Sequence, residues 1–188
     1  HSNAALNDIF SKVMTRGDIP PRYLLRLGSG ERSLKTMSPM DETDEAYSKA
    51  GRVAHTLLKR NELLERVQEL SVSLKVTKES DRAEYTCENS AYFYLHHVQS
   101  RMEIFEKKRK EMKEADTNVA GIFPFKFFFK IDEGENLTLS DARTKFENLR
   151  SLFHELTEYR PLELLRTQRQ RVNYLLTKQA KVIAMTCT

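Results

Sequence analysis

Two long stretches with apolar residues at helical spacing constrain the fold of this chain more than any other feature. The first runs from about residue 47 to 74, and its apolar seam consists of Val53, Leu57, Leu63, Val67, Leu70 and Leu74. The second begins at a cap on Thr86 and runs to about residue 115, with a seam of Ala91, Leu95, Val98, Met102, Phe105 and Met112. A polar connection, residues 76–85, joins them. We therefore predict an antiparallel hairpin of two long helices, and interpret both seams as packing surfaces rather than ligand sites.

The segment that follows the hairpin is unusually aromatic. Residues 122–129 read IFPFKFFF, which is too apolar to be left in solvent, so we expect this segment to pack against the hairpin. Two further helices are predicted after it. One starts near Ser140, with an apolar face of Phe146, Leu149, Leu152, Phe153 and Leu156. The other starts at Pro161, a favoured first-turn residue, with a face of Leu162, Leu165, Val172, Leu175 and Leu176.

The two ends of the chain differ from its helical middle. Ser2 can cap a short helix that stops at Gly17. Residues 23–27 predict a short buried strand closed by a turn at Gly28-Ser29-Gly30, and residues 181–186 predict a second short strand. Because a lone pair of short strands is marginal in water, we expect the other strands of this sheet to lie outside the chain. The predicted fold class is mainly α, a helical insertion flanked by short strands of an incomplete α/β sheet.

Composition excludes several classes of protein. With 31% charged residues and only six Gly and five Pro, the chain is neither collagen-like nor of low complexity. Cys87 and Cys187 lie far apart, which suggests no disulfide framework or zinc-ligand spacing and favours a reducing compartment. Neither a signal peptide nor an apolar run of about 20 residues is visible, so we expect a soluble intracellular protein.

The sequence contains no complete catalytic motif. The phosphate-binding pattern G-x-x-x-x-G-K-[ST] is absent, and Gly28-Ser29-Gly30 lacks the lysine that follows it. His96 and His97 are adjacent on a predicted helix and point about 100° apart, so they cannot chelate one ion together. We predict no catalytic residue, no metal ligand and no cofactor within this chain.

Basic residues offer a weaker signal for nucleic-acid binding. The net charge of +4 permits binding to a polyanion but does not argue for it. The candidate phosphate contacts within the helices are Lys107, Lys108, Arg109, Lys110, Arg166 and Arg169. Glutamates at helical spacing interleave the first cluster, which is also typical of an ordinary solvated helix face.

Two short motifs resemble those of a known enzyme class. The segment HSNAAL resembles motif Ia of superfamily 1 helicases of the up-frameshift class, in which a Ser-Asn pair starts a helix facing the nucleic-acid backbone. The segment IAMTCT resembles a later strand-plus-Thr motif of the same class, which lines the same track. The resemblance implies RNA-backbone contacts by Ser2, Asn3, Thr186 and Thr188. A helix N-terminus suits this role because its N–H groups and positive end attract phosphate.

Longer segments resemble one spliceosomal, intron-binding branch of that class, namely HSNAALNDIF, YLLRLGSGE, GRVAHTLLKRNELLERV, YTCENSAYFYLHHVQSR, IFPFKFFF and AKVIAMTCT. This resemblance implies a fragment of the first RecA-like domain. Residues 1–30 would be a partial RecA-like segment with motif Ia, 31–178 a thumb-like helical insertion, and 179–188 a RecA-like strand with the Thr-rich motif.

The same resemblance implies a parent protein that is an ATP-dependent RNA helicase of pre-mRNA splicing. We expect it to be nuclear, to bind single-stranded intron RNA and spliceosomal proteins, and to hold ATP and Mg²⁺ in segments outside this chain. The fragment itself should have no ATPase activity. The alternative is a helical module that docks a spliceosomal protein without touching RNA.

Overall fold

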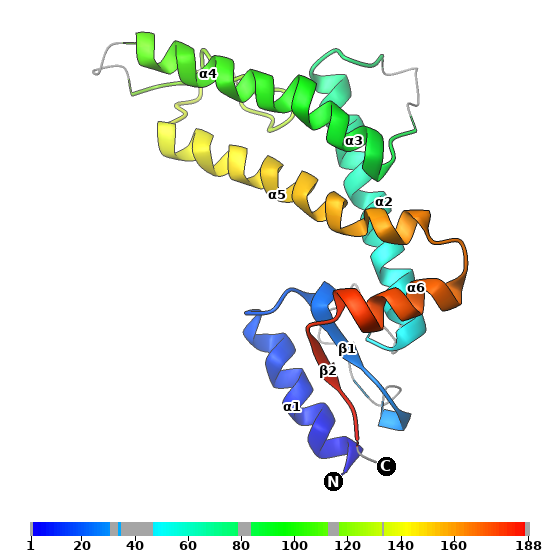
Figure 1. Ribbon diagram of the computed structural model, residues 1–188. Coiled ribbons are helices and arrows are strands. Elements are labelled where there is room, and N and C mark those ends of the chain that lie inside the picture. Colours follow the sequence, from blue (N-terminus) through cyan, green and yellow to red (C-terminus); the bar gives the residue numbers. More distant parts are fainter. Residues whose placement is uncertain are drawn as a thin grey trace. The chain divides into compact units, whose positions relative to one another are not determined.

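The computed structural model describes residues 2–30, 34, 47–78, 84–112, 117–132 and 134–186, and these are mainly helical (Figure 1). The only strands among them form one pair, so the predicted fold class is confirmed. Contacts divide the chain into two compact units, residues 1–59 with 161–188, and residues 60–160. These limits describe compactness, whereas the predicted domain limits at residues 30 and 178 rest on helicase motifs and stay a prediction.

In the first unit, helix α1 (Asn3–Arg16) has the ends that the sequence predicts. The Ser2 hydroxyl accepts a hydrogen bond from the Ala5 amide at 3.2 Å, and Gly17 ends the helix with a φ of 69°. Phe10 is the buried aromatic residue of α1, and its ring meets Tyr47 edge-on with centroids 5.6 Å apart. The local signals at both ends therefore fix this helix.

A short 3-10 turn (Pro21–Tyr23) leads into strand β1 (Leu24–Arg26), which pairs in parallel with strand β2 (Val182–Ala184). Leu24 lies opposite Val182 and Arg26 opposite Ala184. Parallel neighbours require a crossover connection. Everything between the strands is therefore a single, greatly enlarged crossover, as expected for an insertion into an α/β sheet.

The junction of α5 (Leu139–Leu164) and α6 (Gln168–Tyr174) corrects one prediction. The expectation that a helix begins at Pro161 is wrong, because α5 continues through this residue. Proline removes only one helical hydrogen bond, while the next residue, Leu162, is fully buried against Val53 and Leu175. The new helix begins instead at Thr167, whose hydroxyl and Gln170 form a capping box. A π-helical turn (Leu175–Gln179) then leads to β2.

The long helix α2 (Lys49–Ser73) belongs to the second unit from Arg60 onward. There it is followed by α3 (Cys87–Phe93), a π-helical turn (Tyr94–Gln99) and α4 (Ser100–Glu111). Thr86 caps α3 as predicted, in a capping box with Asn89. Figure 1 shows α4 and α5 lying side by side, and the rings of Phe105 and Phe146 join them with centroids 5.1 Å apart. The two long helices that the sequence predicts therefore form a group of three with α5.

The π-helical turn corrects the predicted seam of the second long helix. Ala91 and Leu95 were expected to be buried but are exposed, Leu95 by 57%. Phe93 is buried on the N-terminal side of the turn, and Val98 and Met102 are buried within and after it. A π-helical turn accommodates an extra residue, which rotates the buried face by about 100° relative to an uninterrupted heptad. The seam is therefore shifted at its start and correct at Val98, Met102 and Phe105, whereas Met112 is half-buried and lies just past the end of α4 at Glu111.

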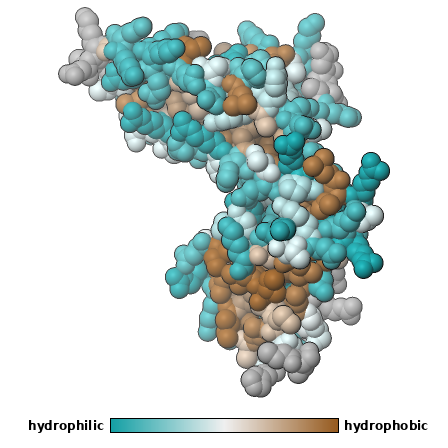
Figure 2. All heavy atoms as spheres, in the orientation of Figure 1, coloured by the Kyte–Doolittle hydropathy of each residue, from teal (hydrophilic) through white to brown (hydrophobic). Residues whose placement is uncertain are grey.

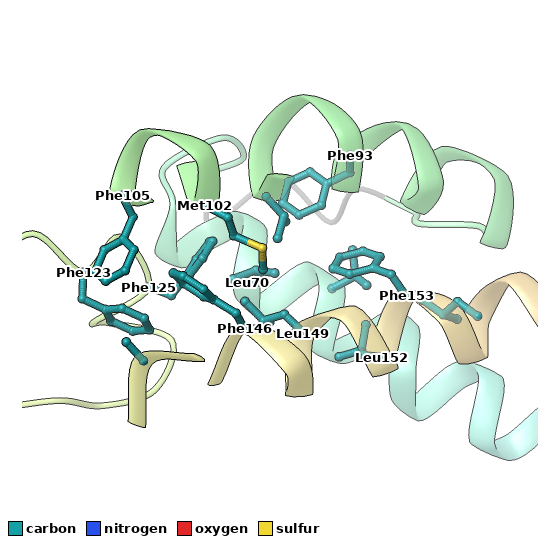
Figure 3. Close-up of a cluster of buried hydrophobic side chains, with 14 of the residues drawn as sticks. Leu70, Phe93, Met102, Phe105, Phe123, Phe125, Phe146, Leu149, Leu152 and Phe153 are labelled. Carbon is teal, nitrogen blue, oxygen red and sulfur yellow. The ribbon is translucent and has the colours of Figure 1, made fainter. Parts of the chain in front are cut away.

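The aromatic segment packs into the core of this unit, as predicted. Phe123 and Phe125 are 2% and 1% exposed, and Figure 3 shows their rings among those of Phe105 and Phe146. Phe123 stacks on Phe146 with centroids 5.5 Å apart, whereas the other two neighbours meet Phe146 edge-on. Phe127 is the exception, since 77% of it is exposed.

Apolar side chains also remain exposed in the unit that contains the sheet. Figure 2 shows them gathered over α1 and the strands, and the large ones include Ile9, Ile183 and Met185. A two-stranded sheet leaves such a face uncovered, in agreement with an incomplete sheet. None of the helices in the described ranges is both long and apolar enough to span a membrane.

Candidate nucleic-acid interface

The start of α1 lies at the edge of the sheet where both strands end. The Asn3 amide nitrogen donates to the Ser29 hydroxyl at 3.0 Å, which ties the first turn of α1 to the turn that follows β1. The first N–H groups of a helix have no acceptor within the helix and are available to a ligand. Ligands of open α/β sheets bind outside the carboxyl ends of the strands. Ser2 and Asn3 therefore lie at the edge of the sheet where a ligand of such a fold would bind.

Thr186 reaches the same edge from the end of β2. A Cβ placed on Gly28 would lie 3.9 Å from the Thr186 hydroxyl and 3.9 Å from the Arg26 guanidinium. The structure thus brings Ser2, Asn3 and Thr186 together from segments more than 150 residues apart in sequence. The fourth candidate, Thr188, lies outside the described residues.

Arg26 is the residue at this edge that the sequence patterns missed. It is fully buried, and its Nε donates to the Asn7 amide oxygen at 2.8 Å while Nη2 donates to the Asn3 amide oxygen at 2.9 Å. Its Nη1 donates to the carbonyls of Leu27 and Ala184, next to the ends of β1 and β2. One signal in the sequence could have indicated it, namely a single charge inside the apolar run YLLRL.

A second bond closes this polar cluster. The Asn7 amide nitrogen donates to the Gly30 carbonyl at 2.9 Å, so that one side chain of α1 contacts both Arg26 and the turn after β1. Asn7 is itself only 8% exposed. Buried polar groups that are all hydrogen-bonded fix one arrangement of the backbone segments that carry them.

The remaining candidate residues lie elsewhere. Lys107, Lys108 and Lys110 are exposed on α4 in the second unit, where Arg109 is half-buried. A cavity of about 560 Å³ beside them is also lined by Glu103 and Glu106, so its charge is mixed. Arg166 and Arg169 are exposed at the start of α6 in the first unit. Within the first unit, the candidates that the structure brings together are therefore the motif residues Ser2, Asn3 and Thr186.

The two adjacent histidines take part in packing. The ring of His96 lies 4.1 Å from Tyr92, and that of His97 lies 5.2 Å from Phe93. Partial burial, with added repulsion from Arg101 and His96, lowers the pKa of His97 below its ordinary value of 6.5. Among the residues that the structure describes, no three metal-ligating side chains converge.

Comparison with known proteins identifies the relative. The chain is 41% identical, over 202 aligned positions and its entire length, to the RNA helicase aquarius of Mus musculus. The chain matches a segment of aquarius. The predicted resemblance to an RNA helicase of this type is thereby confirmed, as a match to a fragment of aquarius. The chain spans 13% of the length of aquarius, and no family model matches it.

Proposed function

We propose that this aquarius-like chain contributes to the RNA-backbone site of an ATP-dependent RNA helicase that acts in pre-mRNA splicing in the nucleus. The observation that carries the proposal is the convergence of the start of α1 with Thr186 at the carboxyl edge of β1 and β2. The match to an RNA helicase supports RNA as the ligand. Single-stranded intron RNA and spliceosomal proteins are the proposed partners.

The chemistry of these residues suits a phosphodiester. Ser2, Asn3 and Thr186 offer hydroxyl, amide and helix-terminal N–H donors, which bind phosphate oxygens without reading the base. Contacts of this kind hold the strand in place while leaving its sequence free. The site would therefore bind many RNA sequences with similar affinity, as a translocating enzyme requires.

ATP and Mg²⁺ belong to other parts of the proposed enzyme. The chain has no G-x-x-x-x-G-K-[ST] segment to cradle the phosphates. The proposed role of the motif residues is to hold RNA beside the helical insertion, and α4 and α6 would add the further contacts of Lys107, Lys108, Arg109, Lys110, Arg166 and Arg169.

Fluorescence anisotropy with a labelled single-stranded RNA tests this role in the full-length protein that carries the chain. The double variant Ser2→Ala/Asn3→Ala should bind about tenfold more weakly, because two donors to a charged phosphate are lost. The matched control is Asn148→Ala/Ser151→Ala, which removes the same two side-chain types from exposed positions of α5. Equal affinity of the two double variants would remove Ser2 and Asn3 from the site.

The alternative function is protein docking without RNA contact. Its structural basis is the set of exposed apolar side chains in the second unit, which includes Tyr92, Leu95 and Phe127. The match to an RNA helicase does not favour it. The same titration separates the two, because binding of RNA that weakens with added salt contradicts a module with no RNA contact.

A further inference from the structure

We infer that Arg26 is the positioning residue of the proposed RNA site, and that its buried charge supplies much of the attraction for the phosphate. This inference rests on the proposed function, since it concerns the same edge of the sheet. It adds a residue that does not touch RNA itself but acts through Asn3 and the strand ends.

The hydrogen bonds of Arg26 connect all the segments that form the site. Nε and Nη2 hold Asn7 and Asn3, which are one helical turn apart on α1. Nη1 reaches the carbonyls of Leu27 and Ala184, at the ends of the two strands. A planar guanidinium presents its donors in a fixed fork, so these partners cannot move independently of one another.

The charge of Arg26 has only neutral partners among the described residues. Its acceptors are two amide oxygens and two backbone carbonyls, and it forms no ion pair with a described carboxylate. Burying a cation whose described partners are all neutral is costly, and an apolar side chain between Leu25 and Leu27 would avoid that cost. An anion bound at the start of α1 would complete the charge balance, with Asn3 between the cation and the phosphate.

Gly30 shows how closely the turn approaches this cluster. A Cβ at this position would overlap Nη2 of Arg26 and lie 2.8 Å from the Asn3 amide oxygen. Any larger residue would therefore displace the guanidinium or Asn3. The requirement for glycine arises here from space rather than from a left-handed backbone.

The decisive variant is Asn7→Asp, measured by RNA anisotropy in the full-length protein over a range of salt concentrations. It keeps an oxygen that accepts the Nε bond and places a carboxylate beside the guanidinium, but it also removes the amide donor to the Gly30 carbonyl. We expect about tenfold weaker binding at low salt and a shallower salt dependence, because the carboxylate neutralises the charge of the guanidinium. The control Asn148→Asp makes the same change of charge on the exposed face of α5 and should bind like the unmodified protein. A purely structural role for Arg26 predicts that Asn7→Asp leaves the salt dependence of RNA binding unchanged, and that result would overturn the inference.

A second pair of variants tests the positioning itself. Gly30→Ala should weaken RNA binding at least as much as Asn7→Asp, whereas Gly121→Ala, where a Cβ meets no atom within 4 Å, should have no effect. Arg26→Lys should keep part of the RNA affinity that Arg26→Met loses, because lysine retains the positive charge but lacks the planar set of donors of a guanidinium. Failure of the unmodified protein to bind RNA would refute the proposed function and this inference together. If the unmodified protein binds RNA and the Asn7→Asp and Gly30→Ala variants bind it equally well, the inference alone is refuted.

Discussion

Substitution of Phe125 by alanine tests whether the aromatic segment is a structural plug. Phe125 is 1% exposed, and its ring lies 5.9 Å from those of both Phe123 and Phe146. Removing a buried phenylalanine costs about 3–5 kcal/mol, because its apolar surface is no longer buried and a cavity remains. A domain is stable by only about 5–15 kcal/mol, so we expect this one change to remove a large part of the stability of the second unit.

Phe127 provides a control two positions away in the same segment. It is 77% exposed, so Phe127→Ala should change the free energy of unfolding by no more than about 0.5 kcal/mol. Because the chain has two compact units, stability is best followed as amide hydrogen exchange of peptides from α4 and α5 in increasing urea. Phe125→Ala should open these peptides at much lower urea. If both variants resemble the unmodified protein, the assignment of the segment to the core is wrong.

Three further predictions concern the helices of the second unit. The lowered pKa of His97 means that the folded state binds a proton less readily than the unfolded state. The stability of this unit should therefore fall as the pH drops below the ordinary histidine pKa near 6.5. In urea titrations between pH 5 and 8, His97→Gln should abolish that dependence. Thr86→Ala should cost about 1 kcal/mol by removing the cap of α3, measured by the same titration at pH 7.5, and a change below about 0.3 kcal/mol would show that the cap contributes nothing. Leu95→Gln should be tolerated while Val98→Gln lowers the melting temperature by several degrees, and the reverse order would contradict the shifted register of the π-helical turn.

Much of the local structure could be predicted because it depends on neighbouring residues. The hydroxyls of Ser2 and Thr86 accept hydrogen bonds from amides three residues later, and the Gly17 amide donates to the Met14 carbonyl. These bonds fix helix ends within four residues, and the sequence shows all of these residue types. The buried face of α5 follows from its helical spacing alone. Such signals do not require knowledge of the rest of the fold.

The errors have a tertiary cause. The sequence favours a helix start at Pro161, but the burial of Leu162 against α2 and the following π-helical turn keeps α5 continuous. The heptad pattern does not predict the π-helical turn near Leu95. The extra residue of this turn is recognised only from the structure, in which Phe93 and Val98 are buried in the same core. Tertiary packing decided both positions.

The candidate site likewise contains residues that could be predicted from local sequence and one residue that could not. Ser2, Asn3 and Thr186 could be named from their motifs, since short segments carry the resemblance to a helicase. Arg26 could not be assigned a role, because its partners come from α1, from the turn after β1 and from β2. Only the folded arrangement shows that one buried cation joins the motif residues.

Photocrosslinking of RNA to the full-length protein tests the central claim most directly. A single-stranded RNA that contains 4-thiouridine is irradiated with the protein, and the crosslinked peptides are identified by mass spectrometry. The account predicts crosslinks in peptides that cover the start of α1 and the end of β2, near Asn3 and Thr186, which an excess of unlabelled RNA should remove. Crosslinks confined to α4, or none within this chain while RNA is bound elsewhere, would contradict it.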